Sequence, residues 1–443
     1  PPQSNELDLR SPIVEFRPGY VRRALRSFTG HEFGIGVIHS HPEGTWPSPS
    51  RLDDDMDDYF SQEFERYSEG RPYVSLIIAR DDHGQRTFSG RAFDRGEWLP
   101  VKTWITAGLD VVARDKAFDW GAPAPVFDPD ATKERLMELI GCDAMTRLRE
   151  ATVGIIGCSG LGSPAAHVLA RAGIGRFVLV DKGRFKPSNH ERNHASRASD
   201  TVGDPPWKTD LLCRLVHEIA PNTRVTCIVG DVLDEAVVDE LVQCDLVLGC
   251  TDSVYARAAL GDLALHYHIP VLDLAVQMRA SDSIIKDQVG EIARYAAGLP
   301  CPWCRGRVNA RDIFEETISP EEKAQRQHAA AAARARGADA EQYWTNGERH
   351  ELTVGYMTTT VAAMGAGYTQ HWLTGLACIP HDRFQFDLGL QQFGFVKDQR
   401  SPCPDCLCQQ RIGFADQGRA DRTVSKPHHW PEAKLTHCFG KFG

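Results

Sequence analysis

The hydrophobic and polar positions of the chain from residue 150 onward alternate between short apolar runs and longer amphipathic stretches. Apolar runs predict strands at 152–156, 176–181, 224–229, 245–249 and 270–274, and amphipathic stretches predict helices at 163–172, 208–219, 233–242 and 254–267. Strands and helices that alternate at this spacing form a parallel sheet through right-handed crossovers. The pattern therefore predicts a doubly wound α/β fold, preceded by an amphipathic segment at 133–149.

The pattern before residue 119 differs and is of the α+β type. It predicts strands at 13–16, 33–39, 73–80 and 86–94, with a helix at 20–28. The proline-rich stretch DWGAPAPVFDPDA (119–131) reads as a linker. A chain of 443 residues suits two domains, and we predict them at 1–125 and 126–443. Residues 305–350 predict a mobile helical insertion.

Composition narrows the class of protein. The chain is 42% hydrophobic and 25% charged with a net charge of −10, so no basic bias favours nucleic acid. We find no apolar run of about 18 residues, as a membrane span needs, and no signal-peptide pattern at the start. We therefore expect a cytoplasmic protein with neither nucleic acid nor a membrane as partner. Thirteen cysteines, an odd number that includes two Cys-x-x-Cys pairs, favour bound metal in a reducing compartment over disulfides.

A glycine loop follows the first strand of the predicted parallel sheet. Gly157, Gly160 and Gly162 lie between the strand and a helix, where backbone N–H groups and the helix N-terminus can meet phosphate. A tight turn without a ligand is the alternative. Asp181, about 20 positions on and at the end of the next strand, is placed to accept ribose hydroxyls, which favours a nucleotide site.

Three further motifs follow the loop in order: SNHERNH (188–194), GDPPWKTD (203–210) and GCTDS (249–253). Together with the loop, they make residues of about 130–410 resemble the ThiF/MoeB superfamily, which has the fold of ubiquitin-activating enzymes. The resemblance implies a Rossmann-like adenylation domain that uses ATP and Mg²⁺. It implies that Asp181 holds ribose, that Asp252 binds Mg²⁺, and that the ATP phosphates are held by Asn189, Arg192 and Lys208.

Arg135 and Ser159 are two further positions that the ThiF/MoeB resemblance singles out. Arg135, before the first strand, is the candidate for the family's arginine finger, which often comes from a partner subunit. Ser159 stands where the family usually has a second consecutive glycine, and its side chain narrows the backbone approach to phosphate.

Two cysteine pairs predict a zinc site. Cys301 and Cys304 form one Cys-x-x-Cys knuckle, and Cys403 and Cys406 form another about a hundred residues on. Four thiolates of this kind make a closed tetrahedral Zn²⁺ site, and pairs at these places also occur in the ThiF/MoeB family. A redox dithiol, the alternative, needs only one pair. Cys408 is a spare or competing thiol.

Enzymes of this superfamily that pass their product on as a thioester carry a further cysteine in the crossover segment. No cysteine lies between 305 and 376. We therefore expect direct transfer of the activated product to an external nucleophile, a cysteine of a separate conjugating-enzyme-like protein. Cys378 is the first residue to test as an exception.

The stretch VIHSHPEGTWPSPSRLDDD (37–55) carries a second candidate metal site. His39 and His41 point to one side of a strand, and with Ser50 and Asp53 they match His-x-His-Pro-x7-Ser-x-x-Asp. This resembles the JAMM motif of the JAB/MPN metalloprotease family, which implies zinc on His39, His41 and Asp53 and oxyanion stabilisation by Ser50. An incidental pairing of polar residues is the alternative.

The JAMM resemblance lacks one element. The family takes its general base from a glutamate on an upstream strand, and of the residues before His39 only Glu6, Glu15 and Glu32 are glutamates, none at the expected place. We therefore predict weak or no isopeptidase activity for this sequence.

The two resemblances together imply a JAB/MPN-like domain fused to a ThiF-like adenylating domain, as in bacterial ubiquitin-like conjugation operons, several of which are linked to phage defence. The implied activity is adenylation of the C-terminal glycine of a ubiquitin-like protein by a homodimer. Two alternatives stay open. One is an adenylating enzyme for a sulfur carrier or a peptide in cofactor or antibiotic synthesis. The other is that the first domain only binds the ubiquitin-like protein.

Overall fold

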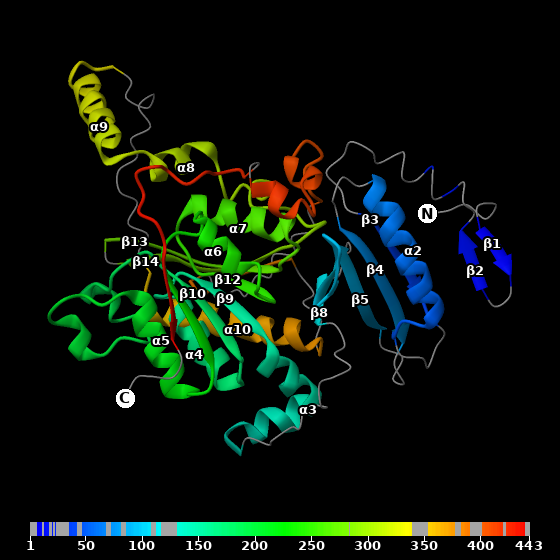
Figure 1. Cartoon of the computed structure of the whole chain (residues 1–443). Coiled ribbons are helices and arrows are strands. Elements are labelled where there is room, and N and C mark those ends of the chain that lie inside the picture. Colours follow the sequence, from blue (N-terminus) through cyan, green and yellow to red (C-terminus); the bar gives the residue numbers. More distant parts are fainter. Residues whose placement is uncertain are drawn as a thin grey trace. The chain divides into compact units, whose positions relative to one another are not determined.

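The computed structural model of the chain forms two compact units (Figure 1), one of residues 1–106 and 113–124 and the other of residues 107–112 and 125–443. The structure describes residues 7–10, 13–16, 20, 23, 35–41, 47–67, 72–80, 86–107, 112–116, 131–282, 284–338, 353–376, 382–389, 401–419 and 422–438.

The first unit is built on a four-stranded sheet with strand order β3-β4-β5-β6. Strand β3 runs parallel to β4, and the other neighbours are antiparallel. The strands and their helix are β3 (Ile35–Ser40), α2 (Arg51–Tyr67), β4 (Tyr73–Arg80), β5 (Arg86–Asp94) and β6 (Glu97–Pro100). Two further two-stranded sheets are described in the first 116 residues: β1 (Leu7–Arg10) with β2 (Ile13–Phe16), which are antiparallel, and β7 (Thr103–Ala107) with β8 (Val112–Lys116).

Helix α2 packs on this sheet through an aromatic core and a buried ion pair. Phe60 and Phe64 lie four residues apart on one face of α2, are 6% and 4% exposed, and pack against Tyr73 of β4. The Asp57 carboxylate accepts a hydrogen bond from the Tyr73 hydroxyl at 2.8 Å and from Nε of Arg91 at 2.8 Å. Burial and the nearby Asp57 charge raise the pKa of Tyr73. Because a buried charge is tolerated only when paired, this network fixes α2 to the sheet.

The second unit contains an eight-stranded sheet with strand order β15-β14-β13-β12-β9-β10-β11-β16. Its central strands β13, β12, β9, β10 and β11 are parallel, and β14, β15 and β16 join them antiparallel. The strands are β9 (Thr152–Ile156), β10 (Arg176–Val180), β11 (Arg224–Val229), β12 (Leu246–Gly249), β13 (Val271–Ser281), β14 (Ile284–Tyr295), β15 (Arg383–Asp387) and β16 (Lys434–Cys438).

Alternate side chains of the central strands feed two separate cores, one on each face of the sheet. Val153 and Ile155 of β9 point to a core shared with α3, α4, α5 and α10, whereas Ile156 points to a core shared with α6 and α7. Figure 1 shows α6 and α7 on one side of the sheet and α4, α5 and α10 on the other. The helices are α3 (Glu134–Glu150), α4 (Gly162–Ala172), α5 (Lys208–Ile219), α6 (Glu235–Leu241), α7 (Val254–His266) and α10 (Gly355–Thr374).

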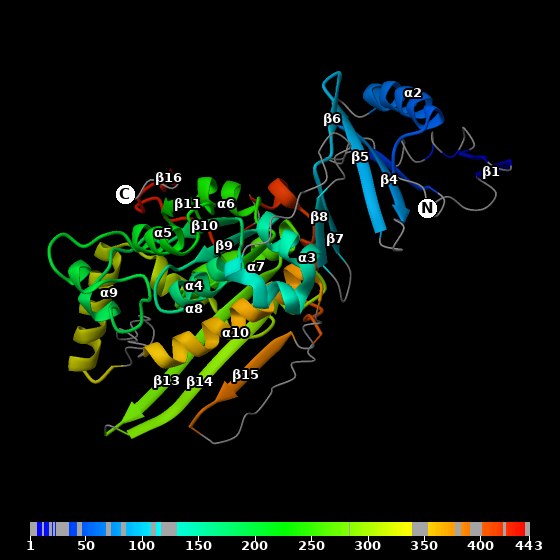
Figure 2. The same ribbon diagram turned by 90° about the horizontal axis from the view of Figure 1, so that it is seen from below.

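Helix α10 runs along β13, β14 and β15 (Figure 2), where Met357 and Val361 pack against Leu274 and Phe386. Residues 310–335 form the helices α8 (Ala310–Thr317) and α9 (Pro320–Ala335). Short 3₁₀ turns are η2 (Ala131–Lys133), η3 (Pro187–Asn189), η4 (Ala198–Thr201), η6 (Leu407–Gln410) and η7 (Ala415–Arg419). None of the described helices is long and apolar enough to cross a bilayer.

The alternating strand–helix pattern predicted for the second unit is confirmed. Predicted and observed bounds coincide for β9, α5 and β11 and differ by at most two residues for the other elements from α4 to α7. Strand β13 is longer than predicted because it pairs with β14 along its whole length and continues beyond the three residues that pair with β12. The helix predicted at 20–28 falls, except for residues 20 and 23, outside the described residues.

Candidate functional site

The glycine loop after β9 turns sharply into α4. Gly157 has φ +96°, and a Cβ on it would lie 2.4 Å from the Cys250 carbonyl oxygen. A Cβ on Gly162 would lie 1.9 Å from the Gly157 carbonyl oxygen, so the first turn of α4 presses directly on the loop. At Gly160 a Cβ would meet Cδ of Arg192 at 3.2 Å. Side chains at Gly157 and Gly162 would therefore clash with backbone, and one at Gly160 would press on Arg192.

Replacing Gly162 tests this close packing. We expect Gly162→Ala to lower the free energy of unfolding by about 2–4 kcal/mol, because the added methyl group overlaps a carbonyl that cannot move freely. The matched control is Gly367→Ala in α10, where a Cβ meets nothing within 4 Å. That variant is expected to be unchanged or more stable by up to about 1 kcal/mol. Urea unfolding midpoints compare the two, and equal midpoints would contradict the packing described here.

Ser159 lies inside the loop, and its hydroxyl fits a phosphate site. The Ser159 carbonyl accepts from Oγ of Ser163 at 2.7 Å, which holds the loop on the first turn of α4. The Ser159 hydroxyl oxygen is buried and has no hydrogen-bond partner among the described residues. An unsatisfied buried hydroxyl is costly, and a bound phosphate oxygen would satisfy it.

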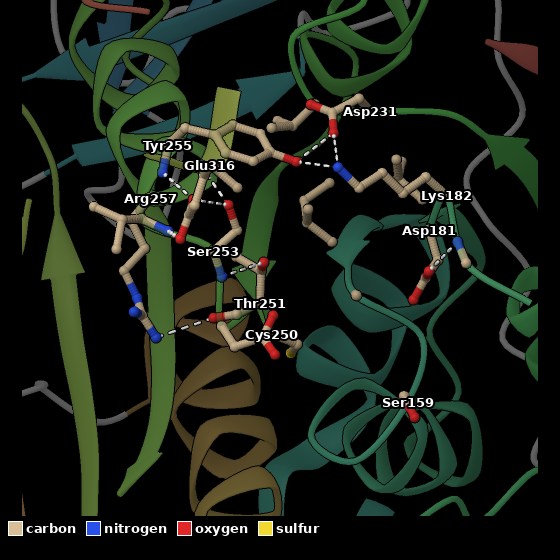
Figure 3. A pocket seen from close by; sticks show the side chains of 18 of the residues that line it. Ser159, Asp181, Lys182, Asp231, Cys250, Thr251, Ser253, Tyr255, Arg257 and Glu316 are labelled. Carbon is tan, nitrogen blue, oxygen red and sulfur yellow. Dashed lines mark hydrogen bonds and ion pairs between the residues drawn. The ribbon is translucent and has the colours of Figure 1, made fainter. Parts of the chain in front are cut away.

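Asp181 lies at the carboxyl end of β10, beside the loop (Figure 3). Its carboxylate accepts from the backbone N–H of Cys158 at 2.9 Å and of Gly183 at 2.7 Å. Nζ of Lys208, at the start of α5, lies 3.9 Å from the same carboxylate. Each carboxylate oxygen keeps a lone pair for another donor. The backbone therefore orients the Asp181 carboxylate and leaves it able to accept hydrogen bonds from ribose hydroxyls.

The other predicted phosphate and magnesium ligands gather around this loop. Arg192 donates from Nη1 to the Thr353 carbonyl oxygen at 3.0 Å and lies against Gly160. Asn189 is buried, and its side-chain oxygen accepts from the Lys186 backbone N–H at 3.0 Å. Asp252 is exposed and follows β12. The structure thus brings residues from four loops to one edge of the sheet.

These residues line a cavity of about 1100 Å³ at the carboxyl ends of the parallel strands. Of the predicted nucleotide residues, the cavity wall includes Gly157, Gly160, Asp181, Asn189, Arg192, Lys208 and Asp252. Gly162 lies behind the loop, and Arg135, on α3, is not part of the wall. A cavity with a glycine-lined floor, two cations and a carboxylate at each side fits a nucleoside triphosphate with Mg²⁺.

Sequence reasoning missed a second group of wall residues. Lys182 donates to the Asp231 carboxylate at 3.1 Å and to the Tyr255 hydroxyl at 2.6 Å, and the Tyr255 hydroxyl donates to Asp231 (Figure 3). The ammonium also lies over the ring of Trp430. The position of Asp231 after a parallel strand was a usable signal, since such positions face the ligand edge. No motif in the sequence around Trp430 indicated that this residue would line the cavity.

Helix α8 supplies another wall. The Glu316 carboxylate accepts from Oγ of Ser253 at 2.7 Å and from the backbone N–H groups of Val254 at 3.1 Å and Tyr255 at 3.2 Å. A carboxylate at this place is stabilised by the N-terminus of α7. The segment predicted as a mobile insertion is therefore helical at α8 and α9, and α8 is tied to the loop that carries Asp252.

Four cysteine sulfurs form a closed group in the second unit: those of Cys301, Cys304, Cys406 and Cys408. The sulfur of Cys301 lies 3.6 Å from that of Cys304 and 3.7 Å from that of Cys406, and Cys304 and Cys408 are 3.7 Å apart. Zn–S bonds of about 2.3 Å in a tetrahedron place sulfurs about 3.8 Å apart. The group therefore fits Zn²⁺.

The group differs from the predicted ligands at one position, because Cys408 takes the place predicted for Cys403. The turn η6 directs Cys408 inward, where it is 6% exposed and packs with Leu265. Cys403 is exposed and contributes its backbone N–H, which donates to the Cys304 sulfur at 3.4 Å. The sequence spacing favoured Cys403 and Cys406 as the second pair of ligands. Because a 3₁₀ turn follows Cys406, Cys406 and Cys408 are instead the two that lie close to Cys301 and Cys304.

In the first unit, His39, His41 and Asp53 meet as the sequence predicts. Nε2 of His39 lies 3.3 Å from Nε2 of His41, and Asp53 lies 3.0 Å from His39 and 3.2 Å from His41. Ligands about 2.0–2.1 Å from a tetrahedral ion are about 3.3 Å apart. Burial alone raises the pKa of Asp53, but hydrogen bonds from Ser50 and the two imidazoles lower it overall. The three side chains fit one Zn²⁺ ion.

Ser50 holds this carboxylate from the start of α2. Its backbone N–H donates to Asp53 at 2.7 Å, and its hydroxyl accepts from the Asp53 backbone N–H at 3.3 Å. This reciprocal cap fixes Asp53 at the helix N-terminus. Of the glutamates before His39, Glu6 and Glu32 lie outside the described residues, and Glu15 belongs to β2.

The similarity of this chain to known proteins lies in the second unit. Residues 132–408 match the ThiF family. The chain is 30% identical over 141 residues to the sulfur carrier protein ThiS adenylyltransferase of Escherichia coli. The aligned residues make up 32% of this chain and 55% of that protein. It is 31% identical over 168 residues to the molybdopterin-synthase adenylyltransferase of E. coli, which is 38% of this chain and 63% of that protein. The aligned part thus spans less than two thirds of either relative.

Solved structures with a similar fold include E. coli MccB with ATP, at 15% identity and a TM-score of 0.45, covering 63% of this chain and 74% of that one. The family match covers most of the second unit. The chain belongs to the ThiF family.

Proposed function

We propose that this protein uses ATP to adenylate the C-terminal carboxylate of a small ubiquitin-like protein and releases pyrophosphate. The observation that carries the proposal is the cavity at the carboxyl ends of β9, β10 and β12, where the glycine loop, Arg192, Lys208 and Asp252 face one space. ThiF-family relatives that are adenylyltransferases of small carrier proteins support it.

The chemistry follows from the charges around the cavity. A carboxylate oxygen of the partner attacks the α-phosphorus, a P–O bond forms to the acyl group, and the bond to the β-phosphate oxygen breaks. Negative charge grows on the α-phosphate and on the leaving pyrophosphate, so fixed cations accelerate the step. Arg192 and Lys208 are those cations, Asp181 orients the ribose, and Asp252 would hold Mg²⁺, which supplies further neutralisation of the phosphates.

The partner's identity separates this proposal from its alternatives. The test is to co-purify the protein with candidate small proteins and to measure ATP–pyrophosphate exchange with each. We expect exchange only with a ubiquitin-like protein that ends in glycine, and none when its C-terminal residue is removed. Exchange with a sulfur carrier or a short peptide would instead assign the site to cofactor or peptide synthesis.

Transfer of the adenylate is proposed to be direct, to a cysteine of a separate conjugating-enzyme-like protein. Among the described residues, Cys250 is a cysteine in the cavity wall, and burial, together with the Asp273 charge, raises the pKa of its thiol. A protonated thiol is a poor nucleophile. The segment from 305 to 376 has no cysteine, and Cys378 lies outside the described residues.

Non-reducing gels test direct transfer. After incubation of enzyme, ATP and partner, we expect no reductant-sensitive adduct on this chain, because the expected nucleophile is on another protein. A thioester that disappears in Cys378→Ser but not in Cys142→Ser would contradict direct transfer. Cys142, exposed on α3, is the control for accidental reaction of a surface thiol.

For the first unit, we infer a Zn²⁺ site of the JAMM type at His39, His41 and Asp53, with Ser50 as oxyanion donor. The separations of 3.0–3.3 Å among the three ligands support it. Zinc there would act as a Lewis acid toward a peptide or isopeptide carbonyl. The unit either cleaves ubiquitin-like fusions or binds the ubiquitin-like protein without cleaving it.

His39→Ala tests this metal site. We expect the variant to hold one zinc fewer per chain than the wild type, because two remaining ligands bind Zn²⁺ weakly. Elemental analysis measures it, and His328→Ala, at an exposed histidine of α9 outside both ligand groups, is the control. We expect weak or no cleavage of ubiquitin-like fusions by the wild type, since no general base has been identified. An unchanged zinc content in His39→Ala would contradict the metal site. Efficient cleavage by the wild type that is lost in His39→Ala would contradict the expected weak activity.

We also propose a homodimer in which Arg135 acts as an arginine finger in the partner's site. This proposal is supported by the position of Arg135 on α3, outside the cavity wall of its own chain. The association with a bacterial conjugation pathway and phage defence stays a prediction from the sequence resemblance.

A further inference from the structure

The chain returns to the cavity after the family match ends. Residues 132–408 match the ThiF family, and His429 and Trp430, from the segment beyond them, line the cavity. Trp430 is partly buried, whereas His429 is exposed. A residue from outside the matched region therefore forms part of the candidate nucleotide site.

The segment that carries Trp430 is anchored on both sides of it. Before Trp430, the backbone N–H of Thr423 donates to Asp262 of α7 at 2.7 Å, and Lys426 forms an ion pair with Asp234. After Trp430, β16 pairs antiparallel with β11, from Lys434 opposite Val229 to Cys438 opposite Val225. These anchors fix the position of the indole ring relative to the sheet.

The order of the strands indicates which end of the cavity Trp430 occupies. The glycine loop ends β9, Asp181 ends β10 next to it, and Asp231 follows β11, one strand farther on. With phosphates on the loop and ribose at Asp181, the base must extend toward β11. Trp430 lies at this end, because Lys182, the residue after Asp181, places its ammonium 4.2 Å from the indole centroid.

The surroundings of Trp430 form a rigid aromatic wall. The rings of Tyr255 and Trp430 meet edge to face with centroids 5.0 Å apart. Lys182 and the Tyr255 hydroxyl both bond to the Asp231 carboxylate (Figure 3), which is 7% exposed and also accepts from the Leu233 backbone N–H at 3.1 Å. The Asp231 carboxylate is therefore engaged by Lys182, Tyr255 and the Leu233 backbone. The indole of Trp430 remains as an aromatic surface of the cavity wall.

We propose that Trp430 contacts the nucleobase and selects a nucleotide over a bare polyphosphate. The inference rests on the proposed function, since it assumes that the cavity binds ATP. It adds a positioning residue that the ThiF-matched region lacks. Stacking on an aromatic side chain depends on the π-face of the base, so the contribution belongs to the base alone.

Two ligands and two variants test the inference. Binding of Mg·ATP and of inorganic tripolyphosphate is measured by calorimetry for the wild type, Trp430→Ala and Trp430→Phe, after thermal melts establish that each is folded. We expect Trp430→Ala to weaken ATP binding about tenfold, as loss of one aromatic platform typically does, and to leave tripolyphosphate binding unchanged. Trp430→Phe should retain most of the ATP affinity.

Each other outcome overturns a defined claim. Unchanged ATP affinity in Trp430→Ala, or equal loss for ATP and tripolyphosphate in both variants, would show that Trp430 is structural and overturn the inference while leaving the nucleotide site in place. Failure of the wild type to bind ATP would overturn the proposed function itself, and the inference with it.

Discussion

Arg192→Ala and Lys208→Ala are each expected to reduce partner-dependent pyrophosphate exchange by at least about 100-fold. Each change removes a fixed cation from the developing charge at the α-phosphate, which is worth on the order of 3 kcal/mol of barrier. The Arg192 side chain lies against Gly160 of the loop, and Lys208 lies 3.9 Å from Asp181, so both charges reach the same end of the cavity. Exchange rates at saturating ATP measure the effect.

Arg184→Ala is the matched control for both variants. Arg184 precedes Arg192 by eight residues, but its guanidinium packs on Trp207 and donates to the Pro205 carbonyl oxygen, outside the cavity wall. We expect this variant to keep near wild-type exchange. Full activity in both Arg192→Ala and Lys208→Ala, or an equal loss in the control, would remove the assigned phosphate role.

Loss of the cysteine-bound zinc is expected to have the largest effect on folding. Structural Zn²⁺ sites contribute about 10–16 kcal/mol of binding free energy to small domains, which is comparable to or larger than the roughly 5–15 kcal/mol by which proteins are stable. Cys301→Ser removes a 3%-exposed ligand that contacts both Cys304 and Cys406. We expect this variant to lose one zinc per chain and to unfold or aggregate, as judged by elemental analysis and circular dichroism.

A comparison of Cys403→Ser with Cys408→Ser distinguishes the two possible fourth ligands. The sulfur group contains Cys408, so Cys408→Ser should lose the zinc and Cys403→Ser should keep it. The reverse result would restore the two Cys-x-x-Cys pairs as the ligand set. Retention of zinc in both variants would mean that either thiol can complete the site.

Sequence patterns predicted the central fold because β9, β10, β11 and β12 are buried on both faces and each reads as a short apolar run. Helix α2 was not predicted, since its stretch RLDDDMDDYFSQEFERY is rich in acidic residues, and among its described side chains the apolar ones that reach the core are Met56, Phe60 and Phe64. Helix α10 was also missed. It is buried against α4 and β13, and its glycines and β-branched residues give no amphipathic period.

The candidate site was predictable where motifs lie next to strand ends, as at Gly157, Asp181 and Asp252. It was not predictable where the tertiary fold brings distant segments together. Glu316 reaches the start of α7 from α8, and Trp430 reaches Lys182 from beyond the family match. Cys408 likewise depends on a 3₁₀ turn that spacing rules do not show.

The central claim is that a carboxylate of the partner attacks the α-phosphorus of ATP, and isotope transfer tests it most directly. The partner is labelled with ¹⁸O in its C-terminal carboxylate, and the reaction is completed with an added thiol in the presence of pyrophosphatase. Because the bridging oxygen of the acyl adenylate comes from the carboxylate, the account predicts AMP that carries one ¹⁸O. Unlabelled AMP, or ADP and phosphate as products, would contradict it.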